Sequence, residues 1–151
     1  MAEFRIMAIA AATGRIGYVV MAEDKLVDWG ISRAASRSSK KAKAKARDWI
    51  DQLKPEVVVT EAIGPPSRKH GKTLVIMEAI TNAAKDSDVI NVTTSKARSH
   101  RDKYQEAKIL AKRYPELRTR LANKPACWLS EPRRMILFEA LALALRIRQT
   151  E

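Results

Sequence analysis

Residues 55–61 read Pro-Glu-Val-Val-Val-Thr-Glu, a short β-branched run that ends on a carboxylate. An apolar run without polar alternation is typical of a strand that is covered on both faces, as in a parallel sheet flanked by helices. Residues 36–53 before it and residues 73–85 after it have apolar side chains at helical spacing. The stretch therefore predicts an α/β fold in which this strand is buried.

The N-terminal part of the chain predicts an antiparallel meander of three strands. Residues 4–11 form a mostly apolar run, and Gly14-Arg-Ile-Gly17 interrupts it. Short β-like segments follow at residues 18–21 and 26–31.

The second half of the chain predicts alternating helices and strands. We expect a fifth strand at residues 88–93, a basic helix at residues 96–114, and a last helix that is opened by Glu131-Pro132. Residues 64–71 are too rich in Pro and Gly for regular structure, and residues 117–128 fit no clear pattern.

Length and composition limit the class of protein. With 151 residues, of which 46% are hydrophobic, residues 1–151 have the size of one domain with a substantial core. The net charge of +12 predicts a polyanionic partner such as nucleic acid. No apolar stretch is long enough to span a bilayer, and no signal-peptide pattern is present, so we expect a cytoplasmic protein with no membrane partner. The single Cys127 excludes an intrachain disulfide, and the isolated His70 and His100 lack zinc-site spacing.

Basic residues are concentrated in two tracts and a loop. The first tract has no acidic residue between Ile31 and Arg47 and contains Arg33, Arg37, Lys40, Lys41, Lys43, Lys45 and Arg47. Like charges along a helix repel one another unless phosphate neutralises them. Residues 96–124 form the second tract, and the loop Arg68-Lys-His70 lies between the two. This distribution predicts contacts with the phosphates of two duplex arms and little contact with base edges.

Two glutamates are notable because apolar sequence precedes or surrounds them. Glu61 closes the β-branched strand, and ligands usually bind at the carboxyl edge of parallel strands in open α/β folds. Glu139 lies within residues 135–145, which are apolar on every side and predict a largely buried helix. A buried carboxylate needs a cation, which is either a metal ion or a basic side chain. The alternatives are a solvated strand end for Glu61 and a buried ion pair for Glu139.

Three blocks of the sequence, taken in order, match a known pattern. They are Ile6-Met-Ala-Ile-Ala-Ala-Ala-Thr-Gly-Arg-Ile-Gly-Tyr-Val-Val20, Lys54-Pro-Glu-Val-Val-Val-Thr-Glu-Ala62 and Phe138-Glu-Ala-Leu-Ala-Leu-Ala144. The first resembles the opening strand and turn of RuvC-like Holliday junction resolvases, which belong to the RNase H-like superfamily. The second resembles the strand of that family that ends in a catalytic glutamate, and the third resembles its C-terminal helix.

The resemblance implies a five-stranded mixed sheet, with its first three strands antiparallel and helices on both faces. It also implies phosphodiester hydrolysis in branched DNA by two divalent ions, Mg²⁺ or Mn²⁺. The family's metal ligands fall on Ala10, Glu61 and Glu139, and its basic catalytic residue falls on Lys103. Because a four-way junction is two-fold symmetric, a homodimer is implied as well. The helix at residues 73–85 is our candidate interface, unless its apolar stripe faces the sheet.

The chain departs from the family pattern at the acidic site. Ala10 stands where the family has its first aspartate, and alanine cannot ligate a metal. Ile136 stands where a further acid is frequent, and Glu131, two helical turns before Glu139, is the nearest substitute. An aromatic residue expected after the second acid is missing from residues 63–71. An engineered substitution, a natural loss and a shifted alignment would each explain Ala10, and we favour the first because the other acids and the basic surface suit a working enzyme.

Our leading hypothesis is a structure-selective endonuclease that resolves four-way DNA junctions in recombination and repair and that Ala10 has inactivated. A non-catalytic junction-binding protein and an RNA-processing nuclease of the YqgF-like type are the alternatives. The predicted nucleic-acid-binding residues are Arg37, Lys40, Lys41, Arg68, Lys69, Lys72, Lys96, Arg98, Arg101 and Lys103.

Overall fold

The structure is a computed structural model. It describes the backbone of residues 4–23, 25–63, 71–94, 103–120 and 135–149, and the side chains of these apart from residues 103–106, 118–120 and 148–149. The elements are β1 (Arg5–Ala12), β2 (Arg15–Ala22), β3 (Lys25–Ser32), a 3₁₀ turn (Ala34–Arg37), α1 (Ser39–Leu53), β4 (Val57–Glu61), α2 (Lys72–Lys85), β5 (Ile90–Thr94), α3 (Lys103–Arg113), a second 3₁₀ turn (Pro115–Arg120) and α4 (Met135–Gln149).

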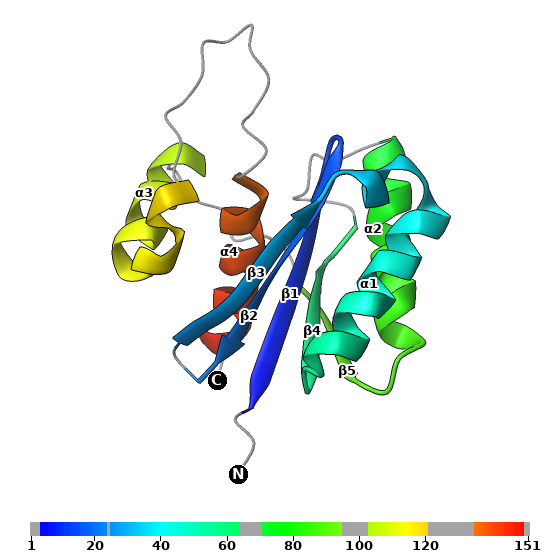
Figure 1. The fold of residues 1–151 in the computed structure, drawn as a ribbon, viewed down its shortest axis with the longest axis horizontal. Coiled ribbons are helices and arrows are strands. Elements are labelled where there is room, and N and C mark those ends of the chain that lie inside the picture. The colour runs from blue at the N-terminus through cyan, green and yellow to red at the C-terminus, as the bar shows by residue number, and fades with distance from the viewer. Residues whose placement is uncertain (1–3, 24, 64–70, 95–102, 121–134, 150–151) are drawn as a thin grey trace, which may run out of the picture.

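The five strands form one mixed sheet in the order β3-β2-β1-β4-β5 (Figure 1). β1, β2 and β3 are antiparallel, whereas β4 pairs parallel with β1 and β5 pairs parallel with β4. The predicted fold class is therefore confirmed, down to the antiparallel order of the first three strands.

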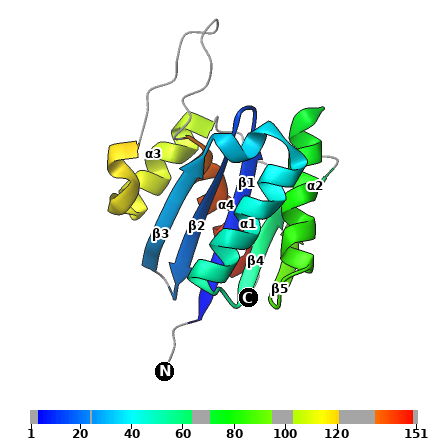
Figure 2. The same ribbon diagram turned by 45° about the vertical axis from the view of Figure 1, so that its right-hand side comes forward.

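Helices cover both faces of the sheet (Figures 1 and 2). α1 and α2 pack on one face, and α3 and α4 supply the core on the other. Consequently β2 and β4 are buried along their whole lengths, and β1 is buried at all but its ends. This double coverage is what the β-branched run of β4 predicted. None of the helices in the described part of the chain is long and apolar enough to cross a membrane.

The largest differences between the predicted and the described element boundaries are at the starts of α1 and β2, and β5 begins at Ile90 where residue 88 was predicted. α1 begins later than expected, because the Ser38 hydroxyl accepts a hydrogen bond from the Lys41 N–H at 3.1 Å and caps the helix. β2 begins earlier than expected, at Arg15, so the turn before it contains only Thr13 and Gly14. Gly14 has a φ of 80°, which glycine adopts without the steric cost of a Cβ. The first part of the predicted basic helix, residues 96–102, lies outside the described residues.

The apolar stripe of α2 is used within the chain. Ile76, Ala79, Ile80 and Ala83 are buried in the core beneath α1 and α2, and only Val75 of the stripe is exposed, at 51%. The stripe faces the sheet and α1, which is the alternative to a dimer interface that the sequence left open. A helix packed on a sheet needs this stripe for its own burial.

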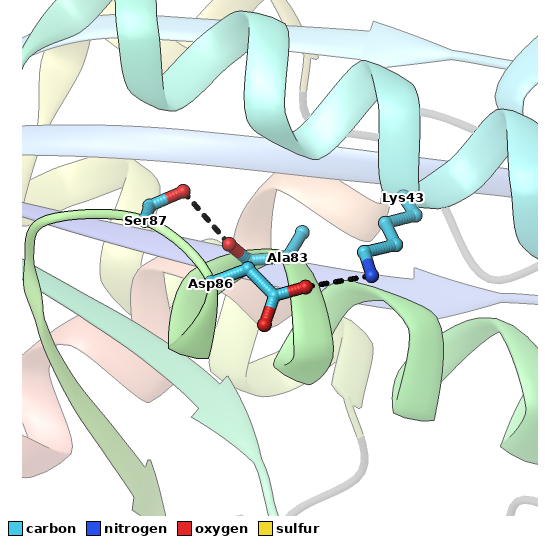
Figure 3. Close-up of polar contacts among 4 residues, drawn as sticks. All are labelled: Lys43, Ala83, Asp86 and Ser87. Carbon is cyan, nitrogen blue, oxygen red and sulfur yellow. Dashed lines mark hydrogen bonds and ion pairs between the residues drawn. The ribbon is translucent and has the colours of Figure 1, made fainter.

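Polar contacts join α1 to the residues that follow α2. Figure 3 shows Lys43 of α1 reaching Asp86, which follows α2, with Nζ 2.7 Å from a carboxylate oxygen. The Ser87 hydroxyl donates to the Ala83 carbonyl at 2.8 Å. The ammonium group of Lys43 lowers the pKa of the Asp86 carboxyl. Since both side chains are exposed to solvent, the pair orients the helices more than it stabilises them.

α4 packs so closely on the sheet that one position of β2 has no room for a side chain. A Cβ at Gly17 would lie 2.7 Å from Cγ2 of Ile136, which is completely buried. Gly17 is the partner of Ala10 in the β1–β2 register. Ile136 therefore sets the distance between α4 and the strands at this point.

We predict that Gly17→Ala lowers the free energy of unfolding by about 1–3 kcal/mol, because the added methyl group overpacks this contact. Ile136→Ala alone should cost about 2–5 kcal/mol through the cavity that it leaves. In the Ile136→Ala background, Gly17→Ala should cost much less than it does alone. Urea unfolding of the four proteins measures this coupling, and strictly additive losses would contradict the close contact.

Tyr18 of β2 lies against the other helical layer. Its ring centroid is 4.6 Å from that of Trp49 in α1, and its hydroxyl donates to an Asp28 carboxylate oxygen at 3.2 Å. Burial of the ring, followed by the neighbouring Asp28 charge, raises the pKa of Tyr18 to about 12. Both effects disfavour the phenolate.

This shift predicts a specific dependence of stability on alkaline pH. The unfolded chain releases the Tyr18 proton near its ordinary pKa of about 10 and the folded chain near about 12, so stability is complete below pH 10 and falls between the two values. Absorbance of tyrosinate during a pH titration should show one transition near pH 12 that Tyr18→Phe removes. Asp28→Asn should move that transition toward lower pH. An unchanged titration in Tyr18→Phe would refute the assignment.

Candidate functional site

Three parallel strands, β1, β4 and β5, end at one edge of the sheet, which we call the carboxyl edge. β3 also ends there, because Ser32 pairs with Ile16 and Ile16 pairs with Ala11. The 3₁₀ turn and α1 follow directly from β3, so α1 begins at the same edge. α4 begins there too (Figure 1). Ile136 in its first turn packs against Gly17, the partner of Ala10. Ligands in open α/β folds bind at such an edge.

Ala10 and Glu61 lie side by side at the carboxyl edge. Ile9 pairs with Thr60 in the parallel β1–β4 register, so the next position along each strand brings Ala10 beside Glu61. Alternate residues of a strand share a face, and Ala8, Ala10, Val57 and Val59 all pack in the core under α4. Both residues therefore face α4, where Ala10 is 1% exposed and Glu61 is 5% exposed.

Glu139 lies on α4, about one helical turn beyond Ile136. It is half-buried, although Phe138 and Ala140 on either side are buried. The sequence predicted that this helix is buried on every side, and this is corrected at Glu139. Glu139 and Ala142 lie on one side of α4 and are both partly exposed to solvent. Partial hydration lowers the cost of the charge. Glu61 and Glu139 both have interaction partners.

Arg15 is a site residue that the sequence did not reveal. It is only 6% exposed, although arginine is seldom buried. Gly17, Val19 and Met21 alternate with it along β2 and face α4, so Arg15 faces α4 as well. Its Nη1 donates to the Thr13 carbonyl in the β1–β2 turn at 2.7 Å. The sequence placed Arg15 inside a turn, where exposure is expected, and nothing local predicts its burial.

The described residues do not fit a two-metal site. They contain no group of three or more His, Cys, Asp or Glu side chains that could hold a metal ion. Two positions that carry acids in the resolvase pattern are occupied by Ala10 and Ile136, both apolar and buried. Glu131 lies outside the described residues, and Lys103 begins α3 but its side chain is not described.

Exposed basic residues surround the carboxyl edge. Arg37, Lys40 and Lys41 lie where α1 begins, and Lys72 lies where α2 begins, all with exposed side chains. The N-terminus of a helix adds a partial positive charge that favours phosphate groups. The predicted residues Arg68, Lys69, Lys96, Arg98 and Arg101 lie outside the described part of the chain.

Two further lysines of α1 make contacts within the chain. Lys43 pairs with Asp86, and Lys45 lies with Nζ 5.8 Å from the centroid of the Trp49 ring. The first basic tract therefore divides into residues with intrachain roles and residues that face solvent at the carboxyl edge. The sequence did not separate the two groups.

Comparison with known proteins assigns the fold. The chain is similar to RuvC of Thermus thermophilus, with a TM-score of 0.64, 16% identity and coverage of 97% of each chain. It is similar to the fowlpox virus resolvase in complex with Holliday junction DNA, with a TM-score of 0.65, 15% identity and coverage of 97% of this chain and 98% of that one. It is also similar to the yeast mitochondrial Holliday junction resolvase Ydc2, with a TM-score of 0.52, 12% identity and coverage of 94% of this chain and 76% of that one.

No protein-family model matches the sequence, and no curated protein matches it. The similarity is therefore one of three-dimensional structure rather than of sequence. The chain has the fold of the RuvC-like Holliday junction resolvases, as the three sequence blocks predicted.

Proposed function

We propose that this protein binds branched DNA, four-way junctions above all, at its carboxyl edge, and that the present sequence holds the junction without cutting it. The exposed basic residues Arg37, Lys40, Lys41 and Lys72 around that edge are the observation that carries the proposal. The fold supports it, since the fowlpox resolvase with the same fold was determined with Holliday junction DNA. The two-fold symmetry of a junction favours a homodimer as the binding form.

We predict that the double variant Lys40→Gln/Lys41→Gln weakens junction binding and lowers its salt dependence. Each phosphate contact contributes about 0.9 to the slope of log K against log salt concentration, so the slope should fall by nearly two if both lysines contact phosphate. Fluorescence anisotropy with a labelled four-way junction over a salt series measures both quantities.

The matched control removes the same charge from the opposite edge of the sheet. Lys25 and Lys85 are exposed and lie in the β2–β3 turn region and at the end of α2. Lys25→Gln/Lys85→Gln should leave the slope almost unchanged. Equal losses in the two double variants would mean that net charge, and not the carboxyl edge, governs binding. Equal affinity for junction and linear duplex would contradict the preference for branched DNA.

A second candidate function is a Mg²⁺- or Mn²⁺-dependent endonuclease in which Ala10 is the single missing ligand. The presence of Glu61 and Glu139 in their expected elements favours it. Lys103 and Glu131 belong to this candidate as proposed catalytic residues. An RNA-processing nuclease would have the same site and a different substrate.

Ala10→Asp separates these functions. We expect the variant to bind junctions and to leave junction DNA, linear duplex and RNA uncut in Mg²⁺, because Ile136 still replaces one acid and Arg15 still adds a buried positive charge. Gel assays of labelled substrates in Mg²⁺ and in EDTA measure this. Cleavage of junctions in Mg²⁺ would establish the endonuclease, and cleavage of RNA alone would establish the RNA-processing enzyme. In either case Glu139→Gln in the same background should abolish cleavage and spare binding.

A further inference from the structure

Arg15 and Glu61 share an unusual property. Among the charged residues whose side chains the structure describes, they alone are buried, at 6% and 5% exposure. They have opposite charges, they face the same helix, and they lie at the same edge of the sheet. Burying a single charge is costly, whereas burying two opposite charges in one region offsets part of that cost.

The strand between them carries only small side chains on the face that Arg15 and Glu61 share. Arg15 lies on β2 opposite Ala12, and Glu61 lies on β4 beside Ala10, so only β1 separates them. Ala10 and Ala12 carry no side-chain atoms beyond Cβ. Two interstrand spacings of about 5 Å and an offset of two residues along the strand put the two Cα atoms roughly 12 Å apart, a distance that a long arginine and a glutamate can largely bridge from either side.

A divalent ion is a poor alternative as the cation of this site. Among the described residues no three His, Cys, Asp or Glu side chains lie together so as to hold a metal ion. A buried guanidinium on the same face also repels a metal ion. The hydrogen bond from Nη1 to the Thr13 carbonyl fixes the guanidinium at the carboxyl edge. Arg15 is therefore the candidate for a basic side chain that compensates the buried carboxylate of Glu61.

We infer that Arg15 is the resident cation of this site. It takes the electrostatic place of a divalent ion by offsetting the buried charge of Glu61, and it makes folding and DNA binding independent of Mg²⁺. The part of this inference that concerns DNA rests on the proposed function, whereas the part that concerns folding stands without it.

A double-mutant cycle tests the charge coupling without DNA. Arg15→Gln and Glu61→Gln should each lower the melting temperature, because each leaves one buried charge without compensation. The double variant should lose clearly less than the sum of the two losses, and Arg15→Lys should keep most of the wild-type melting temperature. Additive losses, or an Arg15→Lys variant as unstable as Arg15→Gln, would overturn the inference. Arg15→Gln alone can fail to fold. In that case, a double variant that folds supports the coupling. If neither the double variant nor Arg15→Lys folds, the inference is overturned.

Arg5 supplies the matched control. It is an exposed arginine at the other end of β1, where its Nη1 donates to the Leu53 carbonyl at 3.0 Å. Arg5→Gln should change the melting temperature by the same amount in the wild-type protein and in the Glu61→Gln variant. A coupling as large as that of Arg15 would show a general charge effect and would overturn the assignment to Arg15.

Metal dependence gives an independent readout. The melting temperature of the wild-type protein should be the same in Mg²⁺ and in EDTA at matched ionic strength, and its junction affinity should change by less than about twofold. A rise in melting temperature with Mg²⁺ in the absence of DNA would overturn the inference. Because this measurement needs no DNA, a protein that fails to bind junctions refutes the proposed function and leaves the role of Arg15 to be decided by the cycle.

Discussion

The double coverage of the sheet by helices is the constraint on which the rest of the structure depends. It buries the side chains of β1, β2 and β4 on both faces, so every polar group on these strands must be compensated inside the protein. Thr60, for example, lies on the face away from α4 and shares a hydrogen bond with Thr93 at 3.2 Å. On the face under α4 the same requirement applies to full charges, and it makes Glu61 and Arg15 the two residues whose environment must be explained.

The site at the carboxyl edge combines the scaffold of a resolvase with a changed set of side chains. Glu61 lies at the end of β4, while Ala10 and Ile136, on which the sequence resemblance placed acids of the family, are apolar and buried. Ile136 also has a structural role, because its side chain packs onto Gly17 and sets the position of α4.

Charge at the surface and charge in the core serve different purposes in this protein. The exposed lysines and arginines at the starts of α1 and α2 are hydrated, so they can meet phosphate at little desolvation cost. Lys43 and Lys45 on the same helix have intrachain contacts with Asp86 and Trp49. Arg15 is buried, and its electrostatic effect is stronger because the surrounding dielectric constant is lower. The basic residues of this chain therefore divide into exposed ones at the carboxyl edge and others with intrachain contacts or a buried position.

The sequence by itself determined the α/β class, the antiparallel start of the sheet, the strand that ends at Glu61 and the apolar stripe of α1, because each depends on local periodicity or composition. It did not determine which partner a stripe meets, so it left open whether the stripe of α2 faces a second subunit or the sheet, and the structure shows that it packs inside the chain. Only the tertiary structure decided that Arg15 is buried, that Glu139 reaches solvent and that Ile136 lies on Gly17. These features depend on the register of the strands and on how α4 packs on the sheet. Both bring together residues that are far apart in the sequence, so no local pattern encodes them.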